Sequence, residues 1–203
     1  MNVLISGGAK NGKSYYAQRI AQQMAEDSCA QATENGGRKM AADRGELRRP
    51  LYYIATMIPH DEEDHARIRR HIAERDGWGF ETLEQGTDLM GLVRQDAEGN
   101  TLADPEGVFL LDSVTALLSN EMFREDGSFD PEAADRVAAD CTAFARETGN
   151  TVFVSDYIYG DADRYDTMTE DYRRALAQVD RALARVCDRV TEVSAGIIEE
   201  WKR

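Results

Sequence analysis

The chain has 203 residues, of which 42% are hydrophobic, and it carries a formal net charge of −14 at pH 7. This length suits one α/β domain with a sizeable core. The acidic balance argues against a nucleic-acid-binding surface, and no apolar run is long enough to span a bilayer. The three cysteines, Cys29, Cys141 and Cys187, form no C-x-x-C pair, which argues against disulfides or structural zinc and favours the cytoplasm.

Five short apolar runs predict strands, and helical patterns separate them. The runs are residues 3–5, 51–56, 108–111, 151–155 and 190–193. Strands that alternate with helices predict a three-layer α/β fold, with a mostly parallel sheet between two layers of helices. We assign residues 1–203 to a single domain. The polar stretch at about 26–50 is predicted to be a loop inserted between the first helix and the second strand.

A glycine-rich motif follows the first predicted strand and matches the phosphate-binding pattern G-x-x-x-x-G-K-[ST] (the P-loop) in full. Its residues are Gly7, Gly8, Ala9, Lys10, Asn11, Gly12, Lys13 and Ser14. A strand, a glycine loop and a helix N-terminus together present backbone N–H groups to a phosphate. We therefore expect Lys13 to reach the β- and γ-phosphates of a nucleoside triphosphate, and the Ser14 hydroxyl to bind Mg²⁺. The alternative is a chance glycine turn before a helix.

Asp112 directly follows the apolar run 108–111. In P-loop enzymes an acidic residue at the end of a neighbouring strand holds Mg²⁺, directly or through water. The sequence thus predicts that Ser14 and Asp112 share a magnesium ion. The alternative is an ordinary aspartate that caps the next turn.

A basic segment at residues 66–75 places Arg67, His71 and Arg75 four residues apart, on roughly one face of a helix. Ile68 and Ile72 lie on another face, where we expect them to pack inward. An imidazole between two guanidiniums forms a local anion site, and neutral imidazole is a competent nucleophile toward phosphorus. The alternative is a solvated charged face with an incidental histidine.

Two further histidines, His60 and His65, flank the acidic run 61–64. A metal site is one interpretation of this pattern. A solvated loop and helix start is the interpretation that we favour.

Several motifs in order resemble one family, the bifunctional adenosylcobinamide kinase/adenosylcobinamide-phosphate guanylyltransferases of cobalamin biosynthesis. They cover most of the chain: I-S-G-G-A-K-N-G-K-S at 5–14, Y-I-A-T at 53–56, R-I-x-x-H with a later arginine at 67–75, F-E-T-L-E at 80–84, L-L-D-S-V-T at 110–115 with L-S-N at 118–120, and V-S-A-G-I at 193–197. The P-loop alone is common to many families, whereas the ordered set is far more specific.

The resemblance implies two reactions. In the first, the γ-phosphoryl group of ATP or GTP moves to a hydroxyl of adenosylcobinamide. In the second, GMP moves from GTP through a covalent histidine intermediate to adenosylcobinamide phosphate, which gives adenosylcobinamide-GDP and pyrophosphate. It also implies a core related to recombinase-type ATPases, corrinoid and nucleotide substrates, and a homo-oligomer, since family members can form trimers.

The resemblance also assigns roles to residues. His71 would be the nucleophile, with Lys13 as the other catalytic residue. Nucleotide contacts would come from the P-loop and from Ala55, Thr56, Met57, Arg67, Ile72, Ala73, Glu74, Arg75, Glu84 and Asp112.

The segment after the fourth predicted strand departs from the family pattern. Asp156 stands where asparagine is usual, the G-I-V-P continuation is absent, and Asp180 replaces another usual asparagine. This segment is where we expect the acceptor site to be shaped. Two alternatives therefore stay open: a diverged kinase or nucleotidyltransferase with another acceptor, and a nucleotide-binding regulator without transfer chemistry. The sequence names no general base.

Overall fold

The computed structural model describes residues 1–34, 49–59, 61–124, 126–160 and 163–203. Within these residues, seven strands form one sheet in the order β3-β2-β4-β5-β1-β6-β7. The strands are β1 (Val3–Gly7), β2 (Leu51–Ala55), β3 (Glu81–Glu84), β4 (Val108–Asp112), β5 (Thr151–Asp156), β6 (Arg189–Ser194) and β7 (Ile197–Lys202). All neighbouring pairs are parallel except β6 and β7, which are antiparallel.

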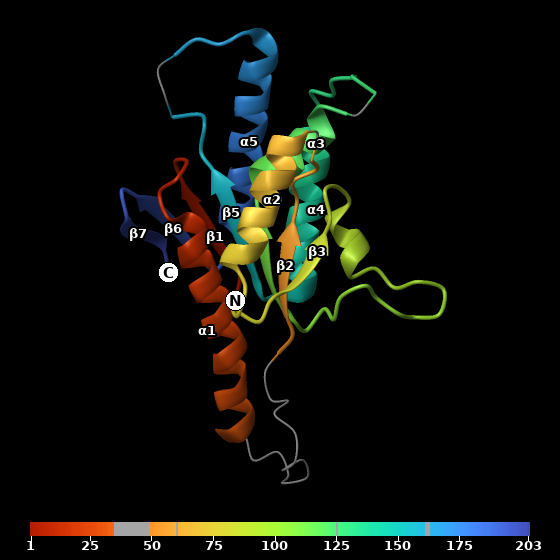
Figure 1. Cartoon of the computed structure of the whole chain (residues 1–203), viewed down its shortest axis with the longest axis vertical. Helices are drawn as coiled ribbons and strands as arrows, with labels where there is room; N and C mark the ends of the chain where they lie inside the picture. The colour runs from red at the N-terminus through yellow and green to blue at the C-terminus, as the bar shows by residue number, and fades with distance from the viewer. Residues whose placement is uncertain (35–48, 60, 125, 161–162) are drawn as a thin grey trace.

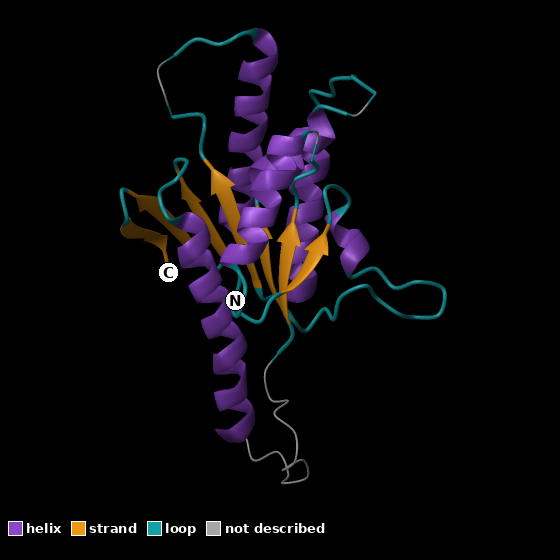
Figure 2. Cartoon of the chain, viewed as in Figure 1, coloured by secondary structure: helices purple, strands orange, loops and turns teal. Residues whose placement is uncertain are grey.

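Helices connect these strands and cover both faces of the sheet (Figures 1 and 2). They are α1 (Lys13–Glu34), α2 (Glu62–Glu74), α3 (Val114–Met122), α4 (Ala133–Thr148) and α5 (Thr167–Val186), with a short 3₁₀ helix, η1 (Leu89–Leu92). None of the helices in the described ranges is long and apolar enough to cross a membrane.

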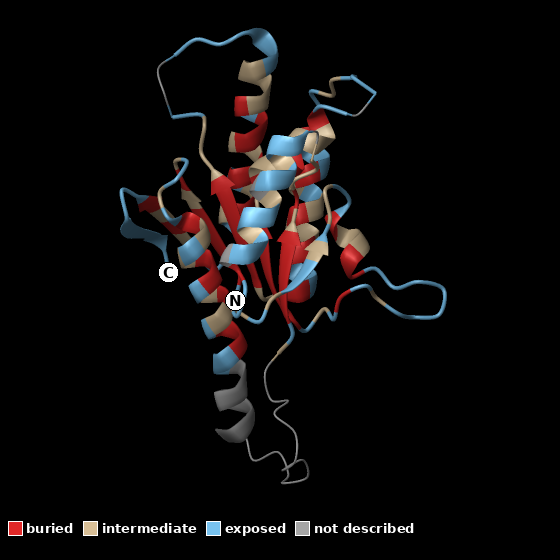
Figure 3. Cartoon of the chain, in the orientation of Figure 1, coloured by how far each residue is buried: buried red, intermediate tan, exposed pale blue. Residues whose placement is uncertain are grey.

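The core lies on both sides of the sheet because successive strand residues point to opposite faces. Val3 and Ile5 pack with α1, whereas Leu4 packs into the larger cluster formed with α3, α4 and α5. Strands covered on both faces are expected to be apolar throughout, which explains the continuous hydrophobic runs in the sequence. Figure 3 shows the buried central strands between the two helical layers.

The predicted three-layer, mostly parallel α/β fold is confirmed, and all five predicted strands are present. The strands β3 and β7 were not predicted. Their residues are mostly exposed, so neither shows the apolar run that marked the other five.

The predicted start of the inserted loop near residue 26 is wrong, because α1 continues to Glu34. Residues 26–34 contain alanine, glutamine and glutamate, which favour helix, and no glycine or proline before Gly36. The polar, charged residues that follow residue 26 therefore belong to the end of a helix before the loop begins. Residues 35–48 of the predicted loop lie outside the described residues.

Candidate active site

The carboxyl ends of the parallel strands border a cavity of about 600 Å³. Ligands of open α/β sheets bind at this edge, and the volume is within the usual range for small-molecule pockets. Predicted residues that line it are Ala9, Lys10, Asn11, Gly12, Lys13, Ser14, Ala55, Met57, His71, Arg75 and Asp112. The fold thus brings residues from four separate segments of the sequence into one site.

The P-loop depends on glycine at two positions for different reasons. A Cβ at Gly7 would lie 2.3 Å from the Val193 carbonyl oxygen of the neighbouring strand β6, which leaves no room for a side chain. Gly12 has φ +86°, a backbone conformation that favours glycine. The Gly12 carbonyl then accepts a hydrogen bond from Tyr16 N at 3.1 Å, so the loop passes directly into α1.

Lys13 lies against the wall of the cavity with only 6% of its surface exposed. Its Nζ donates to the Gly8 carbonyl oxygen at 2.7 Å and forms an ion pair with Asp156 Oδ1 at 2.6 Å. The ammonium group is therefore held inside the loop, at the position where a bound phosphate would meet it.

Asp112 and Ser14 line the same cavity, as the shared magnesium site requires. Asp112 ends β4, which is separated from the P-loop strand β1 by β5, so it lies two strands away and not on the adjacent strand. Asp112 Oδ2 accepts a hydrogen bond from Tyr53 OH at 3.0 Å. The cap of α3 is Ser113, whose side chain accepts from Ala116 N, so a capping role does not account for Asp112.

The end of α2 carries His71 and Arg75 into the cavity, together with Ile68. Arg75 is only 8% exposed, and its guanidinium carbon lies 3.5 Å from the centre of the Tyr53 ring, a cation–π contact. Its Nε is buried with no hydrogen-bond partner among the described residues. Arg75 also lines the cavity, and a guanidinium at a cavity wall is suited to an anion.

Two details of α2 differ from the sequence prediction. Ile72 is 48% exposed, so the expectation that it packs inward is wrong. Ile68, His71 and Arg75 line the cavity, whereas Ile72 is turned away from it. The side chains of Arg67 and Glu74 lie outside the described part of the chain.

Six other predicted contacts do not line the cavity: Gly7, Gly8, Thr56, Ile72, Ala73 and Glu84. Thr56 is fully buried, and its hydroxyl accepts from Ser113 N and donates to Ser113 O, both at 2.8 Å. This contact ties the end of β2 to the end of β4. Ile72 borders a second hollow of about 390 Å³ that also includes Arg75. Ala73 and Glu84 are exposed, with Glu84 aligned beside Ala55 at the end of β3.

The cavity also contains residues that were not predicted as site residues, and Asp156 and Tyr172 are two of them. Both are held by Thr115 of α3: Asp156 N donates to Thr115 Oγ1 at 2.9 Å, and Tyr172 OH donates to the Thr115 carbonyl oxygen at 2.8 Å. Burial, and then the negative charge of Asp156, raise the pKa of the Tyr172 phenol to about 12. A signal for Asp156 existed in the sequence, because it ends an apolar run just as Asp112 does.

The histidine-flanked acidic run behaves as a helix start. Asp61 caps α2 by accepting from Asp64 N, and exposed His65 donates from Nδ1 to the Asp61 carbonyl oxygen at 2.8 Å. His60 lies outside the described residues. Within the described ranges no group of three or more potential ligands could hold a metal ion by itself.

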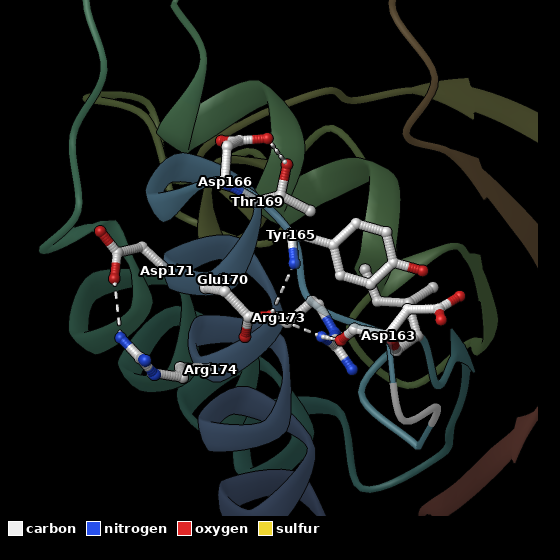
Figure 4. A network of polar contacts seen from close by, with 9 residues as sticks. Asp163, Tyr165, Asp166, Thr169, Glu170, Asp171, Arg173 and Arg174 are labelled. Carbon is white, nitrogen blue, oxygen red and sulfur yellow. Dashed lines mark hydrogen bonds and ion pairs between the residues drawn. The ribbon is translucent and has the colours of Figure 1, made fainter.

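The segment between β5 and α5 is organised by Arg173, which is 7% exposed (Figure 4). Its Nε donates to the Ile158 carbonyl oxygen at 3.0 Å, and an η-nitrogen donates to Glu170 Oε1 at 2.8 Å. The guanidinium also lies 4.8 Å from the centre of the Tyr165 ring. One buried side chain on α5 therefore fixes both ends of the preceding loop.

A buried acid, Asp180, contacts the start of this segment. Asp180 is 6% exposed, and its Oδ2 accepts from Ser155 Oγ at 3.0 Å and from Tyr159 OH at 2.8 Å. Its Oδ1 has no hydrogen-bond partner among the described residues. Burial raises the pKa of Asp180 to about 6.

Comparisons with known proteins identify the family of this chain. The family model "cobinamide kinase / cobinamide phosphate guanyltransferase" (CobU) matches residues 34–200. The bifunctional adenosylcobalamin biosynthesis protein CobU of Escherichia coli (strain K12) is 24% identical over 208 residues, which cover 97% of each chain. The corresponding CobP of Pseudomonas aeruginosa is 27% identical over 200 residues, with 97% of this chain and 95% of the relative covered.

Among solved structures, the flagellar accessory protein FlaH of Methanocaldococcus jannaschii is 12% identical with a TM-score of 0.47, covering 99% of this chain and 77% of FlaH. A second solved structure, an ATPase domain, is 13% identical with a TM-score of 0.47, covering 94% of this chain and 68% of that domain. Because the family model spans far more than half of the sequence, this chain belongs to the CobU family of cobinamide kinases and cobinamide phosphate guanyltransferases.

Proposed function

We propose that this chain catalyses two successive transfers on one corrinoid substrate. It phosphorylates adenosylcobinamide with ATP or GTP. It then transfers GMP from GTP, through a covalent GMP adduct on His71, to adenosylcobinamide phosphate. The products of the second transfer are adenosylcobinamide-GDP and pyrophosphate.

The observation that carries this proposal is that His71 lines the same cavity as the P-loop and Asp112. A site that only bound a triphosphate would need no nucleophile near the phosphates. Arg75 strengthens the argument, because a guanidinium that lines the same cavity suits a second phosphate contact.

The residues present fit Mg²⁺, which binds nucleotides through one or two protein oxygens, the phosphates and water. The Ser14 hydroxyl and the Asp112 carboxylate both border the cavity, and the Tyr53 hydrogen bond orients Asp112. These two residues would hold the ion against the phosphates. When bound, Mg²⁺ supplies positive charge that offsets the charge developing on the transferred phosphorus group.

The protein's own groups then have distinct roles in the guanylyl transfer. The P-loop and Lys13 hold the triphosphate, and the His71 imidazole attacks the α-phosphorus of GTP. The bond between the α-phosphorus and the bridging oxygen breaks, so pyrophosphate leaves and GMP stays on nitrogen. An oxygen of adenosylcobinamide phosphate next attacks the same phosphorus and releases His71. Arg75 stabilises negative charge during both steps.

The test uses the purified protein with Mg²⁺ and GTP that carries the label on either the α- or the γ-phosphate. We expect a covalent label from α-labelled GTP only, labile to acid because it is a phosphoramidate. Peptide mapping by mass spectrometry should place GMP on His71. Adding adenosylcobinamide phosphate should discharge the label and form adenosylcobinamide-GDP.

A matched pair of variants on one helix separates chemistry from folding. His71→Ala should abolish labelling, whereas His65→Ala should label as the unmodified protein does, because His65 is exposed and contacts only the start of α2. A label on another residue would move the nucleophile elsewhere. GTP binding without any label would leave a kinase or a binding protein.

A further inference from the structure

We propose that Asp156 binds the acceptor hydroxyl and takes its proton during the phosphoryl transfer. The proposal rests on the function proposed above and supplies the proton acceptor that the reaction lacks. It gives Asp156 a role in the reaction itself, beyond its contact with Lys13.

The position of Asp156 in the sheet places its carboxylate beside the transferred phosphate. Asp156 ends β5, the strand between the P-loop strand β1 and the Asp112 strand β4. It is aligned with Gly7, the first residue of the P-loop, and its Oδ1 lies 2.6 Å from Lys13 Nζ. Any phosphate that Lys13 reaches is therefore also close to Asp156.

The surroundings of Asp156 leave its carboxylate accessible to a substrate. Its side chain is 35% exposed and borders the cavity, whereas the Lys13 side chain is only 6% exposed. Its backbone N–H is fixed by Thr115 Oγ1 at 2.9 Å. The carboxylate is thus held in place by its backbone while one face remains open to the cavity.

The charges around Asp156 explain why its carboxylate needs a hydrogen-bond donor during the reaction. With Lys13 beside it, the negative charge of Asp156 is neutralised. Once a triphosphate attracts Lys13, a second anion beside the γ-phosphate becomes unfavourable unless another hydrogen-bond donor faces it. A hydroxyl group of the acceptor is such a donor, and it must lie next to the γ-phosphorus in order to react.

The transfer step then balances in atoms and charge. The acceptor oxygen forms a bond to the γ-phosphorus while its proton moves to an Asp156 oxygen. The bond between the γ-phosphorus and the β,γ-bridging oxygen breaks, and the nucleoside diphosphate leaves with both electrons. The protonated Asp156 returns its proton to water after the product departs.

The experiment compares the unmodified protein with Asp156→Asn, an isosteric change that removes the proton-accepting charge. We expect the turnover of cobinamide phosphorylation to fall about a hundredfold. A non-hydrolysable GTP analogue should bind at least as tightly, because Lys13 no longer has a competing carboxylate. Asp135→Asn, on the exposed side of α4, is the matched control and should leave both values unchanged.

Two outcomes would overturn the proposal. Turnover of Asp156→Asn within threefold of the unmodified protein would show that no proton acceptor acts at this position. An equal loss of turnover and of analogue binding would reduce Asp156 to a support for Lys13. If the unmodified protein does not phosphorylate cobinamide, the proposed function fails by itself, and GTP hydrolysis, with water as acceptor, gives the same comparison.

Discussion

The P-loop borders the cavity, and the segment between β5 and α5 is flanked by two cavity residues, Asp156 and Tyr172, but the two regions are built in different ways. The P-loop takes its shape from backbone geometry, with Gly7 pressed against Val193 and Gly12 at φ +86°. The β5–α5 segment takes its shape from side chains, chiefly Arg173 and its contacts with Ile158 and Glu170 (Figure 4). Shape set by backbone can be recognised from a short motif, whereas shape set by long-range side-chain contacts cannot.

This contrast agrees with the separate roles that we propose for nucleotide binding and for acceptor binding. All nucleoside triphosphates present the same phosphate groups, so a loop with a fixed backbone shape can bind them. An acceptor is bound by its own functional groups, and a wall made of side chains can vary with the acceptor. Variants of Lys13, Arg173 and Asp180 test this comparison, and a variant of Arg75 tests the guanylyl transfer.

Lys13→Ala removes the P-loop charge that stabilises the transferred phosphate. We therefore expect turnover in both transfers to fall by a factor on the order of a thousand. Steady-state kinetics with GTP and cobinamide measures this, and circular dichroism checks the fold. Normal turnover would remove the loop from the mechanism.

Arg173→Met should destabilise the protein by about 2 kcal/mol, because the half-buried Ile158 carbonyl oxygen loses its donor and Glu170 loses its ion pair. Chemical denaturation measures the free energy of unfolding. Arg174→Met is the control: its side chain is 74% exposed, and its ion pair with Asp171 should contribute no more than about 0.5 kcal/mol. Equal losses in the two variants would contradict the role given to Arg173.

Arg75→Met keeps the aliphatic stem but removes the guanidinium. We expect the rate of GMP labelling to fall about tenfold, since one charged hydrogen bond to phosphate is lost. Arg70→Met, an exposed change on the same helix, should label normally. A loss of stability without slower labelling would make Arg75 a structural residue that packs on Tyr53.

Asp180→Asn should change how stability depends on pH. Burial raises the pKa of Asp180 to about 6, so the folded state holds this proton more tightly than the unfolded state. The folded protein is therefore expected to lose stability as pH rises from about 4 to about 6, by roughly 1 to 3 kcal/mol. In Asp180→Asn this loss should disappear. Melting temperatures from pH 4 to pH 8 would show the two proteins diverging, and parallel curves would contradict the shift.

The sequence predicted the layers of the fold, the P-loop and the strand that carries Asp112, because each depends on local pattern. It missed β3 and β7, which have no buried run. The burial of Arg75 could not be predicted from the sequence either, because it depends on a contact with Tyr53 of strand β2. Asp156 was noticed as a departure from the family pattern, but its contact with Lys13 joins residues 143 positions apart.

Thr115 has a consequence for how this site can evolve. Its hydroxyl holds the backbone of Asp156 and its carbonyl holds Tyr172, while the helix that carries it begins immediately after Asp112 and Ser113. The first turn of α3 thereby joins the carboxyl ends of β4 and β5, whose alignment is set by the sheet pairing of Asp112 with Val154. An insertion or deletion in this turn would move Thr115 away from both of its partners while the sheet still holds the two acidic strand ends. This turn is therefore expected to tolerate fewer changes in length than the exposed loops of the chain.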